Sequence, residues 1–264
     1  MPVLGFIGTG NMGGALARAA AKGGNELLLA NRHPEKAQRL IDEIGGRLCS
    51  NAEVAQTADF IFLGVKPQMM ADMLEEIKPI LARRRDRFFL VSMAAALSIA
   101  DIQEMAGGAY SVIRIMPNTP CAIGEGMTLY ACGEGVGQAE EDSFLKAMAA
   151  AGRFSKLPEK LIDAGSSVAG CGPAFVDLFV EALADGGVAC GLPRVQALEF
   201  AAQMVAGSAK LILESGKHPG LLKDQVCSPG GTTIQGVRAL EKGGFRSAVM
   251  EAVIAAYEKN SRIK

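Results

Sequence analysis

The chain has 264 residues, of which 49% are hydrophobic and 21% charged, and its formal net charge is −1. This length suits one large domain or two ordinary ones, and we expect two. Because positive and negative charges nearly cancel, the chain lacks the basic surface of a nucleic-acid-binding protein. Its high hydrophobic content excludes the composition of a disordered chain. Small molecules and further copies of the chain are therefore the expected partners.

The sequence predicts neither export nor membrane insertion. Its longest apolar runs, such as Phe60–Val65, fall far below the roughly 18 residues that a membrane helix needs. The first residues enter a strand-like run without the basic region of a secretory signal. We therefore expect a cytoplasmic protein without a membrane partner. The six cysteines are scattered, form no C-x-x-C pair and have only two histidines beside them, which favours free thiols and no metal site.

From Val3 to about Leu157, short apolar runs alternate with segments of helical periodicity. The predicted strands are Val3–Ile7, Glu26–Ala30, a short one near Arg47–Cys49, Phe60–Val65, Phe88–Val91 and Val112–Met116. The predicted helices between them include Gly13–Lys22, Glu35–Ile44 and Gln68–Leu81. Strands that are apolar on consecutive residues and separated by helices are typical of a parallel, doubly wound α/β sheet.

The first turn between strand and helix carries the pattern G-x-G-x-x-G, formed by Gly8, Gly10 and Gly13. The first glycine permits the turn, the second lets the backbone approach a pyrophosphate, and the third lets the helix lie close to the strand. The N–H groups at the helix start then face the phosphates. Because the motif follows a strand and opens a helix, we predict a Rossmann-type dinucleotide site at Gly8, Thr9, Gly10, Asn11, Met12 and Gly13.

The end of the second strand indicates which dinucleotide binds. An NAD-preferring fold usually places an acidic residue there, on the ribose 2′-hydroxyl. This chain has Asn31 and Arg32 instead. A guanidinium can hold a 2′-phosphate through paired hydrogen bonds, which predicts NADPH, with NADH as the alternative; a solvated surface role for Arg32 is the competing interpretation.

Other strand ends supply the rest of the predicted cofactor cleft, because ligands of open α/β sheets bind beyond the carboxyl ends of the strands. Pro67 and Pro117 stiffen two of these turns. Asn118 offers a donor and an acceptor that suit a nicotinamide carboxamide or a water molecule. For Lys66, a plain loop cation and a functional one are equally compatible with the sequence.

The second half of the chain is predicted to be helical, and we place the domain boundary between residues 158 and 159. Helices are expected from Pro173 to about Cys190, from Pro193 to Gly216 and from Gly244 to about Lys259. These helices are rich in alanine and apolar on more than one face. There are too few of them to bury all of their apolar side chains against one another. We therefore predict that residues 159–264 form an all-helical domain covered by a second copy of the chain.

One stretch, "DQVCSPGGTTIQGV", interrupts this helical region. Pro229 fixes a turn, two glycines permit unusual backbone conformations, and a helix is expected to begin near Thr232. The uncapped N–H groups and the hydroxyls at such a helix start attract a carboxylate. A simple turn that only begins a helix is the alternative.

With these residues in view, the whole chain resembles pyrroline-5-carboxylate reductase, the family that performs the last step of proline synthesis. The resemblance is carried by "IGTGNMG", "VKPQ", "MPNTP", "GCGPAFVDLFVEALADGGVACGLPR", "HPGLLKDQVCSPGGTTI" and "EKGGFRSAVMEA", in that order. It implies a Rossmann domain followed by a helical domain that interlocks with a second subunit, in dimers or rings of dimers. It also implies NAD(P)H-dependent reduction of 1-pyrroline-5-carboxylate to L-proline.

The resemblance also implies site residues. Backbone amides of Gly231 and Thr232 would hold the substrate carboxylate, the hydroxyl of Thr233 would meet the ring nitrogen, and Gln225 and Glu159 would line the substrate site. Cofactor positions carried over are the glycine loop, Asn31, Arg32, Asn51, Val65, Lys66 and Ala95. Many members have Gly where Ala96 stands.

The chemistry of a cyclic imine fits these residues. Ketone reductases need a proton donor, commonly His, Lys or Tyr, whereas both histidines here, His33 and His218, are predicted in surface loops beside proline. An imine nitrogen can arrive protonated and needs only orientation, which Thr233 could provide. A β-hydroxyacid dehydrogenase is the enzymatic alternative, but its helix Lys is followed by Asn at i+4, where Lys210 is followed by Glu214. A non-catalytic NADP-binding sensor is the other alternative.

Overall fold

The computed structural model describes residues 1–262 and divides into two compact units. The first comprises Met1–Cys171 together with the residues from Ala256 onward, and the second comprises Gly172–Ala255. The first unit thus continues past residue 158, where we expected the helical domain to begin. Each unit is described by itself below.

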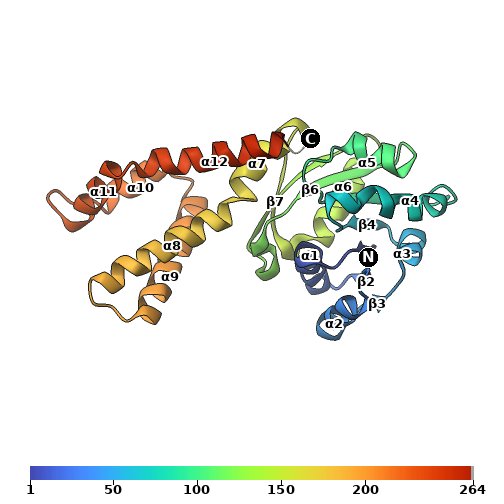
Figure 1. The fold of residues 1–264 in the computed structure, drawn as a ribbon, viewed down its shortest axis with the longest axis horizontal. Coiled ribbons are helices and arrows are strands. Elements are labelled where there is room, and N and C mark those ends of the chain that lie inside the picture. The colour runs from blue at the N-terminus through green and yellow to red at the C-terminus, as the bar shows by residue number, and fades with distance from the viewer. Residues whose placement is uncertain (263–264) are drawn as a thin grey trace. The chain divides into compact units, whose positions relative to one another are not determined.

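The first unit is built on one sheet of eight strands, with the order β3-β2-β1-β4-β5-β6-β7-β8. Figure 1 shows this sheet with helices packed around it. Strands β1 to β6 are parallel, and β1 lies between β2 and β4, so the chain switches direction across the sheet at this point. The strands are β1 (Val3–Ile7), β2 (Glu26–Ala30), β3 (Arg47–Leu48), β4 (Phe60–Leu63), β5 (Phe89–Ser92), β6 (Val112–Met116), β7 (Gly126–Cys132) and β8 (Gly152–Lys156). The doubly wound prediction is confirmed.

Helices cover both faces of this sheet, which explains why its central strands are apolar on consecutive residues. On one face, Leu4, Phe6 and Phe62 pack with side chains of α1 (Asn11–Lys22), α2 (Pro34–Ile44) and α6 (Gln138–Ala147). On the other face, Ile7 and Ile61 pack with α3 (Asn51–Thr57), α4 (Met70–Leu81), α5 (Ile99–Ala106) and α7 (Ile162–Ala169).

The last two strands were not predicted. Strand β7 runs antiparallel to β6, and β8 lies parallel to β7 at the edge of the sheet. A single short 3₁₀ turn, η2 (Thr119–Ile123), separates β6 from β7, so the strand–helix alternation fails here. Strand β8 is largely polar and only partly buried, so it lacks the apolar run by which the other strands were identified.

The second unit consists of helices. They are α8 (Gly172–Ala189), α9 (Arg194–Ser215), α10 (Pro219–Gln225), α11 (Thr232–Lys242) and most of α12 (Phe245–Ser261). The helices predicted from Pro173, Pro193 and Gly244 are confirmed to within about two residues, which is the usual uncertainty of helix ends. The short helix α10 was not predicted, because its seven residues contain a proline and a glycine.

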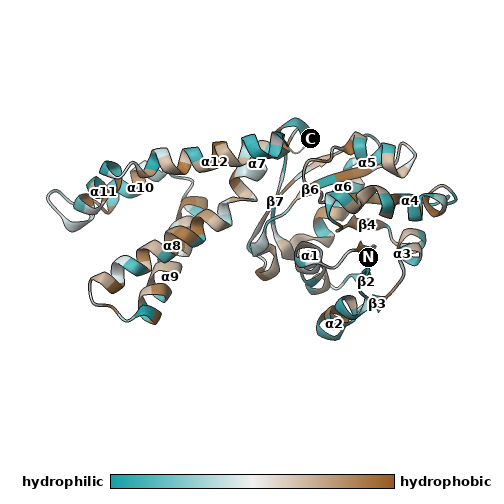
Figure 2. Ribbon diagram, viewed as in Figure 1, coloured by the Kyte–Doolittle hydropathy of each residue, from teal (hydrophilic) through white to brown (hydrophobic). Residues whose placement is uncertain are grey.

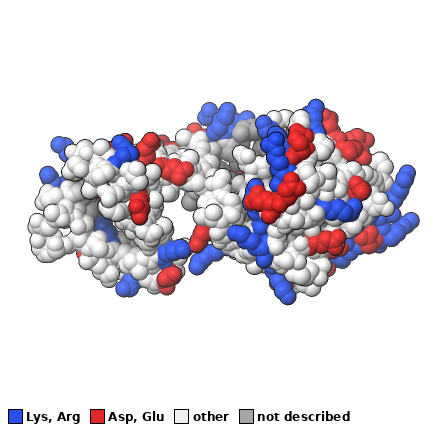
Figure 3. All heavy atoms as spheres, turned by 90° about the horizontal axis from the view of Figure 1, so that it is seen from below, with Lys and Arg blue, Asp and Glu red and all other residues white. Residues whose placement is uncertain are grey.

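The helical unit has a small core of its own. Ala184, Ala197 and Ala201 form a buried cluster where α8 packs on α9, whereas large apolar side chains remain open, including Val195 (77% exposed) and Leu178 (67%). Many residues of α8 and α9 are coloured as hydrophobic in Figure 2, and charged side chains are sparse on the face of the helical unit that Figure 3 shows. A monomer rarely leaves this much apolar surface open, so the unit requires a covering partner.

One helical stretch, Glu159–Ala189, is long and apolar enough to cross a membrane by length and composition alone. Our expectation from short apolar runs missed it, because glycines, alanines and serines separate its larger apolar side chains. Few of its residues are buried within the chain. The apolar surface that the helical unit leaves uncovered therefore includes part of this stretch.

Candidate active site

The glycine loop after β1 has the geometry that dinucleotide binding requires. Gly8 has a φ of +100°, and its N–H donates to the carbonyl oxygen of Ala30 on β2 (2.8 Å). A Cβ atom at Gly13 would lie 2.2 Å from the carbonyl oxygen of Gly8, so only glycine lets α1 start this close to the loop. At Gly10, by contrast, no described heavy atom lies within 4 Å of where a Cβ would be.

Gly10 is therefore the position where the backbone lies open to a ligand. It is the N-cap residue of α1, and no described side chain caps the helix there. The first N–H groups of α1 are thus available for an anion, as expected for a helix start that binds phosphate. The residues present fit the pyrophosphate of a dinucleotide.

The sequence motif did not single out Gly64, which follows β4. Its N–H donates to the carbonyl oxygen of Ile7 (2.8 Å), and a Cβ there would lie 2.4 Å from the carbonyl oxygen of Gly8. The loops after β1 and β4 therefore meet backbone to backbone at the point where the sheet changes direction, which is where nucleotides bind in such folds. The need for glycine at this position follows from the pairing of β1 with β4, which the sequence alone does not reveal.

The loop after β2 presents the residues predicted to select NADP. The side-chain amide of Asn31 donates to the hydroxyl of Thr9 (2.7 Å) and accepts from the N–H of His33 (3.0 Å). These bonds tie the loop to the glycine turn. Arg32 is exposed and, within residues 1–262, has neither an ion pair nor a hydrogen bond through its side chain. Its guanidinium is thus available for a phosphate.

Arg32→Ala is expected to raise the Michaelis constant for NADPH by about 10-fold or more, because charge-assisted pairs with phosphate contribute roughly 1.5–3 kcal/mol. The constant for NADH, which lacks the 2′-phosphate, should change by less than about twofold. Steady-state kinetics with both cofactors give the measurement. Equal changes for the two would contradict this role of Arg32.

Most of the remaining predicted cofactor residues lie at the same edge of the sheet, in the loops that follow β4, β5 and β6. Lys66 is exposed and Val65 half-buried, and Pro67 begins the 3₁₀ turn η1 (Pro67–Met69). Ala95 is exposed in the β5–α5 loop, where its neighbour Ala96 has a φ of +64°. That conformation costs a residue with a side chain roughly 1–2 kcal/mol, so the loop is held in a strained form.

Two predicted cofactor residues have partners within the protein. Asn118, which follows the buried Pro117, is 9% exposed. Its amide nitrogen donates to the carbonyl oxygen of Ala169 (3.0 Å), while its amide oxygen accepts from the N–H of Met127 (2.9 Å). Asn118 therefore fastens α7 and β7 to the loop after β6. Asn51, at the start of α3, donates to Glu76 (2.9 Å). Cofactor contacts of both residues remain predictions.

In the second unit, the stretch Ser228–Thr233 forms the turn that the sequence predicted. The N–H of Gly231 donates to the carbonyl oxygen of Ser228 (3.0 Å), and Gly230 has a φ of +68°. Helix α11 then starts at Thr232 with Gly231 as its N-cap and with no cap from a described side chain. The N–H of Gly231 is thus used by the turn, so the first available N–H groups belong to Thr232 and Thr233, both exposed.

The two other substrate residues expected from the resemblance, Gln225 and Glu159, are distant in sequence and belong to different units. Gln225 is exposed and ends α10 in the second unit. Glu159 lies in the first unit, where its carboxylate accepts from the N–H of Ile99 (2.6 Å) and lies 3.6 Å from a guanidinium nitrogen of Arg114. The structure thus gives Glu159 partners in the protein.

Both histidines are exposed, as predicted, and His218 caps α10 by accepting from the N–H of Gly220 (3.1 Å).

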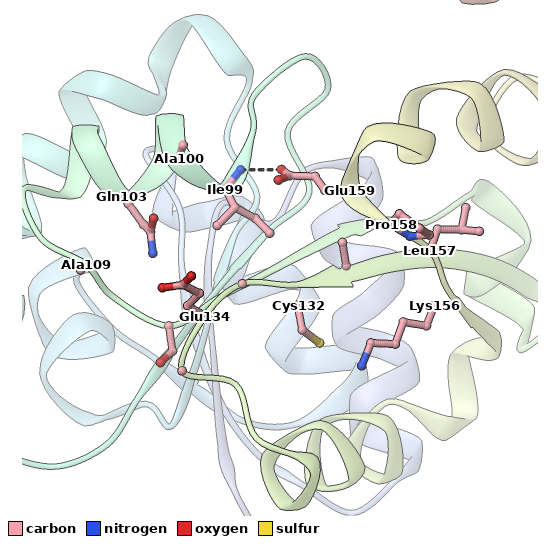
Figure 4. A pocket seen from close by; sticks show the side chains of 14 residues that line it. Ile99, Ala100, Gln103, Ala109, Cys132, Glu134, Lys156, Leu157, Pro158 and Glu159 are labelled. Carbon is pink, nitrogen blue, oxygen red and sulfur yellow. Dashed lines mark hydrogen bonds between the residues drawn. The ribbon is translucent and has the colours of Figure 1, made fainter.

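A groove of about 860 Å³ lies in the first unit, between α5 and the segment from Lys156 to Glu159 (Figure 4). Of the predicted site residues, only Glu159 lines it. Burial, with the nearby Glu141 carboxylate, raises the pKa of its one thiol, Cys132, to about 11, so this thiol is protonated at neutral pH. Among residues 1–262, no three His, Cys, Asp or Glu side chains gather as a metal site requires.

Comparison with known proteins identifies the family. A sequence model described as pyrroline-5-carboxylate reductase dimerisation matches residues 159–263, and one described as NADP oxidoreductase, coenzyme F420-dependent, matches residues 3–96. The pyrroline-5-carboxylate reductase of Pisum sativum is 40% identical over 98% of this chain and 95% of its own length. The chain belongs to the pyrroline-5-carboxylate reductase family.

Further members of the reductase family agree. The reductase of Escherichia coli K12 is 41% identical, with 98% of this chain and 97% of the relative covered. A crystal structure of the Plasmodium falciparum reductase with NADP bound superposes with a TM-score of 0.87 at 34% identity, covering 98% of each chain. In the present chain, the helical unit with its exposed apolar side chains falls within the region that the family's dimerisation model matches.

Proposed function

We propose that this protein reduces 1-pyrroline-5-carboxylate to L-proline with NADPH, as a homodimer in the cytoplasm. The observation that carries the proposal is near-full-length identity of about 40% to reductases of this name, on a chain with two anion-binding helix starts. One start, at Gly10, suits a pyrophosphate, and the other, at Thr232, suits a small carboxylate. Rings of dimers and use of NADH are further parts of the proposal.

The first unit would hold the cofactor through residues that the structure leaves available. The Gly8–Gly13 loop and the start of α1 would receive the pyrophosphate, and Arg32 would pair with the 2′-phosphate. Bound NADPH supplies two electrons as a hydride. The protein's own contribution is to orient the cofactor and to keep the loops after β4 and β5 against it.

The second unit would position the substrate. We propose residues 159–264 as the substrate-binding and dimerisation domain. The N–H groups of Thr232 and Thr233 would bind the substrate carboxylate at the positive end of α11. The hydroxyl of Thr233 would accept a hydrogen bond from the protonated ring nitrogen and so fix the C=N bond. Catalysis then depends on positioning rather than on a covalent step.

Thr233→Ala is expected to lower kcat/KM for pyrroline-5-carboxylate by about 10- to 100-fold, because a hydrogen bond to a charged group contributes roughly 1.5–3 kcal/mol. Thr233→Ser keeps the hydroxyl and should retain most of the activity. The measurement is the loss of NADPH absorbance on adding the substrate. An unchanged kcat/KM in the alanine variant would remove this role.

The proposed activity is tested by the same assay on the wild-type protein, with piperideine-6-carboxylate and NADH as alternative substrates. Rapid NADPH oxidation with pyrroline-5-carboxylate, and L-proline as the product, is the expected result. NADPH binding without turnover of either imine would instead favour the sensor alternative.

A further inference from the structure

One residue that carries a side chain has a left-handed backbone. Ala96 has a φ of +64°, whereas every other described residue with a positive φ is a glycine. In this conformation the Cβ atom lies too close to the following carbonyl oxygen, which glycine avoids because it has no Cβ. Strain of this kind persists only where the surrounding structure enforces it, and it gathers at ligand-binding sites. Ala96 therefore calls for a reason beyond the fold.

The strained residue lies in a loop that is fastened on both faces of the sheet. This loop, residues 93–98, joins β5 to α5. Met93 packs against the core on the side of α1 and α6. Leu97 packs against the core on the opposite side, with α4 and α5. Residues 94–96 therefore cross the carboxyl edge of the sheet, from one face to the other.

Hydrogen bonds fix the two ends of this crossing. Ala94 is buried, and its N–H donates to the hydroxyl of Ser92, the last residue of β5 (3.4 Å). At the other end, Ser98 starts α5 through a capping box. Between these ends, Ala95 is exposed and Ala96 is half-buried. The loop thus has its shape before a ligand arrives, and it presents two methyl groups at the edge of the sheet.

Strand order places this loop under one half of a dinucleotide. The strands run β2-β1-β4-β5 across the sheet. In the proposed function, Arg32 after β2 receives the 2′-phosphate, and the glycine loop after β1 receives the pyrophosphate. A dinucleotide that follows the carboxyl edge in this direction extends its other half over the loops after β4 and β5. That half carries the nicotinamide.

We propose that Ala96 is a cofactor-positioning residue, whose rigidly held methyl group contacts the nicotinamide half of NADPH. The inference rests on the proposed function, because it takes NADPH as the ligand of the first unit. Glycine would suit the backbone of residue 96 better, so the side chain is retained for binding and not for folding. It contributes apolar contact, and it also stiffens the loop, because a glycine would have more conformations to lose when the cofactor binds.

The test compares Ala96→Gly with Ala96→Ser and Gly24→Ala. Gly24 is the matched control, because it has a φ of +72° and lies between α1 and β2, at the opposite edge of the sheet. A Cβ atom there would come no closer than 3.7 Å to a described neighbouring atom. Affinity is measured by titration with NADPH and with 2′,5′-ADP, a fragment that lacks the nicotinamide half. Thermal unfolding and amide hydrogen exchange over residues 93–98 complete the comparison.

Ala96→Gly should bind NADPH about fivefold or more weakly and bind 2′,5′-ADP within about twofold of the wild type, because the lost methyl contact concerns one half of the cofactor. Its melting temperature should stay the same or rise by up to about 3 °C as strain is relieved. Amide exchange over residues 93–98 should become faster without ligand. Gly24→Ala introduces the same strain elsewhere, so its melting temperature should fall by about 2–4 °C while its NADPH affinity stays within about twofold.

An Ala96→Gly variant that bound NADPH like the wild type would overturn the proposal. An equal loss for NADPH and 2′,5′-ADP would also overturn it, because the nicotinamide half would then not be involved. So would a melting temperature lower by several degrees, since alanine would then not be strained there. Ala96→Ser keeps the Cβ atom and should bind NADPH within about threefold of the wild type; a loss as large as that of glycine would exclude the methyl contact. All measurements are made without the imine, so a failure of the proposed reaction would not be mistaken for a failure of this inference.

Discussion

Gly10→Ala is expected to fold like the wild-type protein and to lose most of its affinity for NADPH. The backbone of Gly10 has a φ of −69°, which alanine adopts readily, and no described heavy atom lies within 4 Å of the added methyl group. The free energy of unfolding should therefore change by less than about 0.5 kcal/mol. The methyl group would instead occupy the space that a pyrophosphate needs, so the dissociation constant for NADPH should rise by about 10-fold or more.

Gly13→Ala is the matched comparison, since it changes the same loop by the same methyl group. There the added Cβ would lie 2.2 Å from a backbone oxygen that cannot move aside easily. We expect a loss of about 1–3 kcal/mol in unfolding free energy. Thermal unfolding and NADPH titration of both variants give the measurement. If Gly10→Ala bound NADPH normally, the loop would not be the pyrophosphate site.

The second large effect is expected on assembly. Phe200, Met204 and Leu211 lie on one face of α9 by the helical period, and each is about half exposed in the single chain. Replacing Phe200 and Leu211 together by glutamate should convert the dimer to a monomer, because burying two unpaired carboxylates costs several kcal/mol. Light scattering coupled to size exclusion measures the mass.

The control for this variant carries two new glutamates elsewhere. Arg83 and Arg85 are exposed in the turn after α4, so Arg83→Glu with Arg85→Glu should leave the dimer intact. The α9 double variant should retain its helical circular dichroism in part, since these side chains lie outside the small alanine core. A stable dimer of this variant would mean that another face of the helical unit is covered.

The glycine motif, Arg32 and the turn before Thr232 could be predicted from sequence because each depends on neighbours within a few residues. A positive φ, a helix start or a missing acid at a strand end is a local property. The same is true of the strands that are apolar on consecutive residues, and three of these were predicted to the residue.

What the sequence did not indicate depends on contacts between distant segments. Gly64 approaches Gly8 only because β4 lies beside β1. Glu159 was predicted as a substrate residue, but its contacts with Ile99 and Arg114 join segments that are distant in sequence. Strand β8 pairs with β7 although its own side chains are polar. The side-chain amide of Asn118 can bind a ligand or backbone groups equally well. The sequence therefore did not reveal that it bonds to the backbone of Ala169 and Met127.

The open apolar surface of the helical unit has a consequence for the protein in a cell. Side chains such as Val195 and Leu178 leave water only when a second copy arrives, so part of the free energy that keeps this unit folded comes from association. By mass action, its melting temperature then depends on how much of the protein is present. Lower expression would therefore reduce the number of molecules and also the free energy of unfolding of each one.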